Sequence, residues 1–191
     1  LVTPAVKWNV QPGAPTHLTE LFGPVLSVMR FEKLDEAIDL IHQTGYGLTS
    51  AIETLDEREQ EHWQGRVRAG NLYVNRPTTG AIVLRQPFGG RGKSAFGPGI
   101  KAGGPSYVTQ LMDFKETGEP EGVNLIDDIL RALALRVPTN ELKAALCSYT
   151  KQAHDEFKCE HDHQRLLGQD NLRRYCPVER LCICLHQDDT Q

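Results

Sequence analysis

Residues 25–75 read VLSVMRFEKLDEAIDLIHQTGYGLTSAIETLDEREQEHWQGRVRAGNLYVN, and this stretch decides the fold class. Its first part, Val25–Phe31, alternates enough to indicate a strand. Leu34–Ile41 then places apolar side chains at its first, fourth, fifth and eighth positions, with acidic residues in the first turn and Gly45 beyond the end. We therefore expect a strand followed by an amphipathic helix.

The second half of the stretch repeats this order. Leu48–Ile52 is short and apolar, and Asp56 begins a very polar helix that stops at Gly70. Asn71–Asn75 follows as a strand of aromatic and β-branched type. The order strand, helix, strand, helix, strand predicts an α/β domain in which neighbouring strands are parallel.

A long segment without sustained periodicity, Arg76–Gly104, comes next, and such segments inside a compact domain are usually functional. Residues 90–95 fail as a phosphate-binding Walker A loop, because position 87 is proline where the motif needs glycine. Matches to G-x-G-x-x-A at 90–95 and 97–102 lack the strand and helix that a dinucleotide fingerprint requires. The glycines instead suit close approach of the backbone to a ligand or to another strand.

Beyond this loop, the pattern predicts one more strand over Tyr107–Phe114 and a charged linker containing Gly and Pro over residues 116–123. The first domain then spans residues 1–115 and the second spans 124–191.

In the second domain we expect a helix over Asn124–Arg136 and another from the capping residue Thr139 to about Lys158. Val178–Leu185 is expected to be a strand. Because no crossover and neighbouring strand follow it, we expect the chain to be a fragment.

The composition is that of a globular chain without a strong electrostatic signature. In 191 residues, 21 Lys and Arg stand against 25 Asp and Glu, for a formal net charge of −4. A nucleic-acid surface needs concentrated basic residues, so we expect this segment to contact no nucleic acid. No apolar run approaches the roughly 20 residues that cross a bilayer, and the start lacks a signal-peptide pattern. We therefore expect no membrane span and a cytoplasmic location.

The five cysteines lie in the second predicted domain, at positions 147, 159, 176, 182 and 184. An odd number without a signal peptide predicts reduced thiols. Cys159-Glu160-His161-Asp162-His163 offers thiolate and imidazole ligands, but the ligand spacing typical of structural zinc is missing. We expect no metal site.

Two motifs resemble segments of a known family. Glu20-Leu21-Phe22-Gly23-Pro24 opens a predicted strand, and Pro87-Phe88-Gly89-Gly90 follows the Asn71–Asn75 strand. Both resemble active-site segments of the aldehyde dehydrogenase superfamily. The longer string from Asn71 to Gly99 looks closer still to the glutamate-semialdehyde (1-pyrroline-5-carboxylate) dehydrogenase domain of bifunctional proline utilization A flavoproteins. The resemblance covers about residues 15–115.

This resemblance implies the C-terminal portion of an aldehyde dehydrogenase catalytic domain and roles for individual residues. Glu20 would accept hydrogen bonds from the nicotinamide ribose of NAD, and Phe22 would pack near the nicotinamide ring. The backbone N–H groups of Gly80 and Ala81 would hold a carboxylate of L-glutamate γ-semialdehyde, and Phe88 would pack on its aliphatic stem.

No catalytic residue is expected in this chain, because none of its cysteines has the sequence context of the family nucleophile. In the family's order, the nucleophile, the general base and the Rossmann half lie upstream of Leu1. FAD belongs to a proline dehydrogenase domain further upstream. The resemblance therefore implies a fragment of a homo-oligomeric enzyme of proline catabolism, inactive alone.

The second domain resembles, more loosely, the start of an accessory Rossmann-like domain in longer proline utilization A proteins. Ser148-Tyr149, Phe157, His161-Asp162, Leu167–Asn171 and Arg174-Tyr175 carry this resemblance. Two alternatives stay open: a non-catalytic oligomerisation or lid module, and an aldehyde dehydrogenase of other substrate preference.

Overall fold

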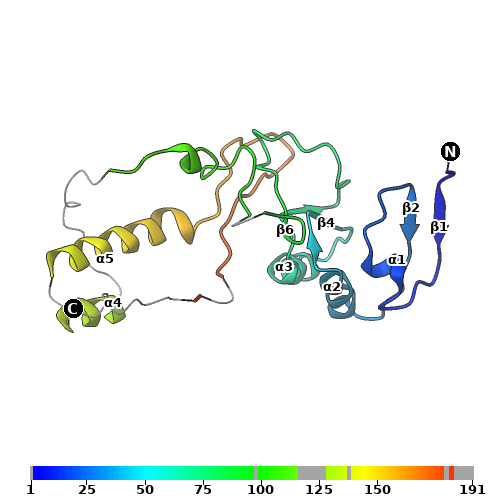
Figure 1. The fold of residues 1–191 in the computed structure, drawn as a ribbon, viewed down its shortest axis with the longest axis horizontal. Coiled ribbons are helices and arrows are strands. Elements are labelled where there is room, and N and C mark those ends of the chain that lie inside the picture. The colour runs from blue at the N-terminus through cyan, green and yellow to red at the C-terminus, as the bar shows by residue number, and fades with distance from the viewer. Residues whose placement is uncertain (1, 97–98, 116–127, 137–138, 179–180, 183–191) are drawn as a thin grey trace. The chain divides into compact units, whose positions relative to one another are not determined.

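The computed structural model of the chain describes residues 2–96, 99–115, 128–136, 139–178 and 181–182. Its contacts divide the chain into two compact units, Leu1–Met112 and Asp113–Gln191 (Figure 1). The predicted domain and linker boundaries at residues 115 and 124 stay a prediction.

The first unit contains two parallel strand pairs. β1 (Ala5–Lys7) pairs with β2 (Val25–Ser27), and β4 (Thr49–Ile52) pairs with β5 (Asn71–Val74). The chain crosses from β4 to β5 through helix α3 (Glu57–Arg66), as a parallel connection requires. The predicted α/β class with parallel neighbours is confirmed.

Two helices pack beside the β4–β5 pair (Figure 1). α2 (Leu34–Gln43) lies where the apolar spacing predicts it, and α3 begins after Asp56, whose Oδ1 accepts the N–H of Arg58 at 2.9 Å. A short further helix, α1 (Pro15–Leu18), starts at a proline. Proline lacks a backbone N–H, but N–H groups in the first turn of a helix have no partner within the helix, so no hydrogen bond is lost.

The core of this unit lies between the two helices and the strand pair. Ile38 of α2 is fully buried and Trp63 of α3 is 2% exposed, and both pack with Val67 and Ala69. The partly buried apolar side chains around them are Leu34, Ile52, Leu72 and Val74. The very polar α3 is therefore held by one inward-facing aromatic ring, whose burial supplies most of its apolar contact area.

The loop after β5 returns to the sheet as β6 (Arg91–Gly92), which pairs antiparallel with β3 (Tyr46–Gly47). A side chain on Gly70 would overlap the carbonyl of Gly89, so two backbones meet here without room for Cβ. On Gly92 of the loop, a Cβ would lie 2.5 Å from the Gly45 carbonyl oxygen, so close approach to another strand, one of the two uses expected of the loop glycines, is confirmed.

The predicted strand over Tyr107–Phe114 is wrong. The structure has a 3₁₀ helix, η1 (Val108–Leu111), in its place. Thr109 Oγ1 donates to the carbonyl of Ser106 at 2.6 Å, and Gln110 Nε2 donates to that of Tyr107 at 3.1 Å. Such local bonds from side chain to backbone favour a turn over a strand ladder.

The second unit contains the two expected helices, α4 (Asp128–Arg136) and α5 (Asn140–Gln152). Thr139 Oγ1 accepts the N–H of Leu142 at 3.2 Å, which confirms the predicted cap. A π-helical turn, η2 (Ala153–Phe157), continues α5. The predicted strand Val178–Leu185 lies largely outside the described residues.

Candidate functional site

Asn71, the first residue of β5, anchors the loop that carries Phe88. Its Nδ2 donates to the carbonyl of Pro87 at 3.1 Å, and its Oδ1 accepts the N–H of Gly89 at 3.4 Å. The backbone on both sides of Phe88 is therefore fixed to the start of a buried strand. The Phe88 side chain is half-buried, so part of its ring is available to a ligand.

Lys101 contacts the same region from the far end of the loop. Its Nζ donates to the carbonyl of Gly70, to that of Gly89 at 3.0 Å and to Asn71 Oδ1 at 3.3 Å. Beside it, Ala102 and Phe88 exchange two backbone hydrogen bonds. One ammonium group thus joins two loop segments to β5.

Gly80 and Ala81 lie on the same loop, just before a turn at residues 83–85. Gly80 has φ +81°, and no heavy atom outside its chain neighbours lies within 4 Å of the position its Cβ would occupy. Just beyond, the N–H groups of Arg85 and Gln86 both donate to the carbonyl of Ile82 at 2.8 Å. The Cβ side of Gly80 therefore faces open space, next to an internally bonded segment, which leaves room for a small anion on that side.

Glu20 and Phe22 lie on a different segment, the turn between α1 and β2. Both are exposed, Phe22 at 97%. The turn is fixed by the N–H of Gly23, which donates to the Leu21 carbonyl at 2.7 Å. Glu20 and Phe22 thus share one turn, whereas Gly80, Ala81 and Phe88 lie on one loop. No hydrogen bond joins the two sets among the contacts given for the described residues.

Asn71 and Lys101 are the residues of this region that sequence reasoning missed. Asn71 stands at the start of a strand, where a polar residue is ordinary. Lys101 had one available signal, since it is the single charge in the stretch GIKAGG at residues 99–104. A lone cation between small residues indicates a partly buried position with backbone partners.

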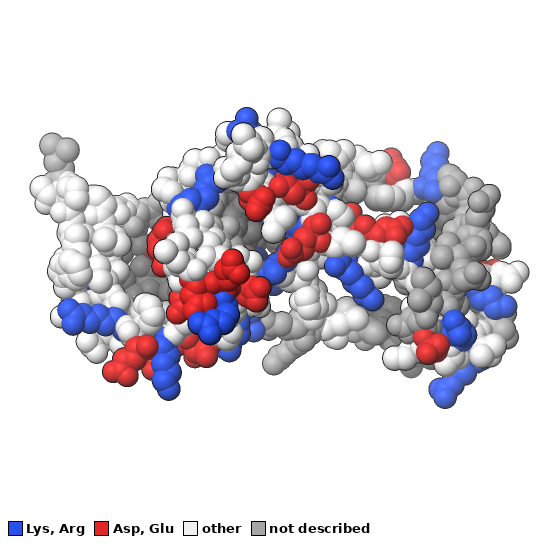
Figure 2. Space-filling view, turned by 180° about the vertical axis from the view of Figure 1, so that it is seen from behind, with Lys and Arg blue, Asp and Glu red and all other residues white. Residues whose placement is uncertain are grey.

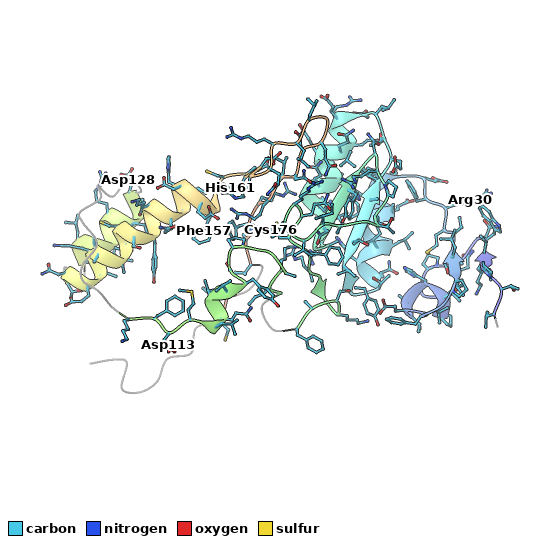
Figure 3. All side chains as sticks on the ribbon, turned by 90° about the horizontal axis from the view of Figure 1, so that it is seen from above. Arg30, Asp113, Asp128, Phe157, His161 and Cys176 are labelled. Carbon is cyan, nitrogen blue, oxygen red and sulfur yellow. The ribbon has the colours of Figure 1, made fainter. Side chains whose placement is uncertain are left out.

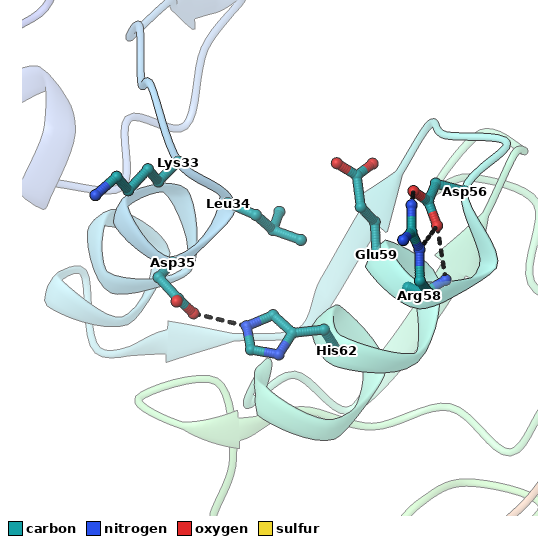
Figure 4. Close-up of a pocket in the computed structure, with 7 residues that line it drawn as sticks. All are labelled: Lys33, Leu34, Asp35, Asp56, Arg58, Glu59 and His62. Carbon is teal, nitrogen blue, oxygen red and sulfur yellow. Dashed lines mark hydrogen bonds and ion pairs between the residues drawn. The ribbon is translucent and has the colours of Figure 1, made fainter.

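A shallow, open pocket lies between the starts of α2 and α3 (Figure 4). His62 Nε2 lies 2.7 Å from Asp35 Oδ1, and this bond, more than any other contact, holds the pKa of Asp35 below its ordinary value. Arg58 bonds to Asp56 and lowers its pKa to about 2. These exposed charges satisfy one another, and none of the residues expected to bind cofactor or substrate lines the pocket.

In the second unit, Glu156 is the centre of a polar cluster that includes His161, which is labelled in Figure 3. Its Oε1 accepts the Tyr175 hydroxyl at 2.9 Å and lies 2.8 Å from Arg173 Nη2. His161 Nε2 lies 3.2 Å from the other carboxylate oxygen. The Tyr175 bond is the main cause that lowers the pKa of Glu156.

Cys159 and the two histidines after it serve local hydrogen bonding. Cys159 Sγ donates to the His154 carbonyl at 3.1 Å, and the rings of His161 and His163 stack with centroids 5.6 Å apart. Within the described ranges, no group of three or more His, Cys, Asp or Glu side chains is arranged to hold a metal ion.

Acidic and basic side chains are interspersed on the face shown in Figure 2. Among the residues that the structure describes, no helix is both long and apolar enough to span a bilayer. The expected lack of nucleic-acid contact stays a prediction.

Residues 1–117 match the sequence model of the family described as "Aldehyde dehydrogenase family". The chain is 43% identical to the Bifunctional protein PutA of Escherichia coli K12, over 89% of this chain and 14% of that protein. It also superposes on the structure of proline utilization A from Corynebacterium freiburgense with a TM-score of 0.84 at 43% identity, covering 92% of this chain and 18% of that one.

A 1-pyrroline-5-carboxylate dehydrogenase from Thermus, solved with bound NAD, matches with a TM-score of 0.52 at 38% identity. That match covers 56% of this chain and 20% of the other. The chain thus spans at most about a fifth of the length of these relatives. The resemblance read from the Glu20–Pro24 and Pro87–Gly90 motifs is confirmed, and the chain belongs to the aldehyde dehydrogenase family.

Proposed function

We propose that this chain is part of an NAD-dependent dehydrogenase that oxidises L-glutamate γ-semialdehyde to glutamate. The observation that carries the proposal is the loop from Gly80 to Phe88, which has open space at the Cβ position of Gly80 and a partly buried aromatic residue whose flanking backbone is fixed to β5. The relatives whose names include 1-pyrroline-5-carboxylate dehydrogenase and PutA support the same substrate.

The substrate-side residues suit an aldehyde that carries a carboxylate at a fixed distance. The N–H groups of Gly80 and Ala81 would bind that carboxylate, because backbone donors add no flexible side chain to order. Phe88 would pack on the aliphatic stem and exclude water from the aldehyde carbon. Binding at both ends of the substrate orients the aldehyde toward the attacking group.

The cofactor-side residues fit NAD. The Glu20 carboxylate has only acceptor sites and is exposed, so it can accept hydrogen bonds from two ribose hydroxyls. The Phe22 ring is 97% exposed and can lie against a planar nicotinamide. When bound, NAD supplies the hydride acceptor. Glu20 and Phe22 would hold it in position.

The chemistry itself is assigned to residues outside this chain. The nucleophilic cysteine and the general base would come from the preceding part of the domain, so the 191 residues alone are expected to be inactive. FAD would be bound by a separate proline dehydrogenase domain. We place the whole protein in the cytoplasm as a homo-oligomer.

Residues beyond about 117 are proposed to begin a non-catalytic accessory region. The family match ends at residue 117, whereas the proline utilization A structure covers 92% of the chain. The Glu156 cluster gives this part its own internal polar contacts, which suits a structural role.

The direct test is NAD reduction by the full-length protein with glutamate semialdehyde, together with the variant Glu20→Gln. The variant is expected to raise KM for NAD, while KM for the aldehyde changes little. The matched control is Glu53→Gln, which alters an exposed acid away from this turn. Absence of NADH formation by the wild-type protein, or equal KM values in the two variants, would count against the assignment.

A further inference from the structure

Three consecutive residues, 101–103, contact both loop segments that carry the proposed substrate-binding residues. Lys101 Nζ donates to the carbonyls of Gly70 and Gly89, and Ala102 pairs with Phe88 through backbone hydrogen bonds of 3.0 and 2.9 Å. These contacts fix the Phe88 segment in addition to the bonds from Asn71.

Gly103 extends these contacts toward Gly80. It has φ +74°, and a Cβ built on it would lie 2.5 Å from the carbonyl oxygen of Val83. The absence of a side chain therefore lets this backbone press against the segment that follows Ala81. A single stretch of chain thus contacts both parts of the loop.

We infer that Lys101 is a positioning residue for substrate binding, which holds Phe88 and the Gly80–Ala81 segment in their relative arrangement. The inference rests on the proposed function, because it assigns Lys101 a role in that same site. Lys101 would not touch the substrate. It acts through two neighbours of Phe88. Gly89 follows Phe88 in the sequence, and Ala102 is its backbone hydrogen-bond partner.

The chemistry of the contacts explains why an ammonium stands here. Lysine has three N–H donors, and the Gly70, Asn71 and Gly89 oxygens accept from this one group. Charge-assisted bonds of this kind are stronger than neutral ones. An apolar side chain of similar length would leave partly buried oxygens without these donors, and the loop would separate from β5.

The test compares Lys101→Met with Lys93→Met in the full-length enzyme. Lys93 lies on the same loop and also donates to a backbone carbonyl, that of Thr44 at 2.9 Å, but it lies beside Tyr46 and not beside Phe88. K101M is expected to raise KM for glutamate semialdehyde about tenfold while kcat changes little. KM for NAD should stay close to wild type.

Two further measurements separate positioning from general loss of structure. Lys101→Arg keeps the charge and several donors, so it should recover part of the lost affinity. Amide hydrogen exchange at Phe88 and Gly89 should be faster in K101M than in K93M. If K101M does not fold, Gly103→Ala replaces it, with faster exchange expected over residues 80–86 and a raised KM for glutamate semialdehyde.

Equal kinetics and equal exchange in K101M and K93M would overturn the inference, as would a fall in kcat alone. A wild-type enzyme that does not oxidise glutamate semialdehyde would instead reject the proposed function. In that case the exchange comparison still decides whether Lys101 holds the loop.

Discussion

Phe88 and Ala102 exchange two backbone hydrogen bonds, of 3.0 and 2.9 Å, across a loop that otherwise has little regular structure. This pairing fixes the backbone of a loop residue in the same way as the backbone of a residue in a strand. It explains how an irregular segment can present an aromatic side chain at a fixed place, as a substrate-binding residue requires.

Phe88→Ala should lower kcat/KM for glutamate semialdehyde about tenfold or more, because the substrate stem loses its apolar contact and water reaches the aldehyde. Steady-state NADH formation measures the effect. The control is Phe96→Ala, which removes a fully exposed ring from the same loop. Similar losses in both variants would contradict a specific role for Phe88.

Gly80→Ala should raise KM for glutamate semialdehyde, since alanine at φ +81° is strained by roughly 1–2 kcal/mol and will displace the N–H groups of residues 80 and 81. Gly13→Ala places the same residue at φ +80°, also with open space around it, so it reproduces the strain far along the sequence from the loop. The account predicts a raised KM only in G80A. A raised KM in both would show that strain alone is responsible.

Gly70→Ala should destabilise the contact between β5 and the loop, because its Cβ would overlap the Gly89 carbonyl. Overpacking of this kind costs roughly 1–3 kcal/mol. Gly65→Ala, within α3 and with nothing near its Cβ position, should instead stabilise that helix by up to about 1 kcal/mol. Amide exchange over residues 71–74 and at Phe88 and Gly89 distinguishes the two, and undisturbed exchange in G70A would be inconsistent with the close approach.

The Glu156 cluster should contribute pH-dependent stability. The folded-state pKa of Glu156 is lowered, first by the Tyr175 hydrogen bond, so its contribution is complete above the ordinary value of 4.5 and is lost as pH falls through the lowered value. Glu156→Gln should therefore speed amide exchange at His161 and Arg173 most near neutral pH, and the difference from wild type should shrink in acid.

The matched control for that experiment is Glu160→Gln. Glu160 forms a longer, more exposed pair with Arg174, at 3.7 Å, which is expected to contribute little. An effect of E156Q that does not depend on pH, or one equalled by E160Q, would argue against the cluster.

Local patterns were enough to predict the elements whose cause is local. The spacing of Leu34 and Ile38 predicts α2, and Thr139 predicts the start of α5, because each depends on residues within one or two turns. The Tyr107–Phe114 strand is wrong for a related reason. The side chains of Thr109 and Gln110 hydrogen-bond to nearby backbone carbonyls, and these bonds favour a turn over a strand. The alternation of apolar and polar residues does not indicate such bonds.

Long-range contacts explain what the sequence could not show. The pairing of β1 with β2 and the contacts of Lys101 with Gly70 join residues far apart in the chain, and no local spacing encodes them. Glu20, Phe22, Gly80, Ala81 and Phe88 came from motif resemblance. Their exposure and loop positions in the structure agree with binding roles, and the roles themselves stay predictions.

We propose that Gly80 and Ala81 select an aldehyde that carries a carboxylate. The most direct measurement is kcat/KM of the full-length enzyme for glutamate semialdehyde against an aliphatic aldehyde of the same length without a carboxylate. The account predicts a preference of at least about 100-fold for glutamate semialdehyde, because the N–H donors of Gly80 and Ala81 would be left unpaired by the other substrate. Equal values for the two aldehydes would contradict it.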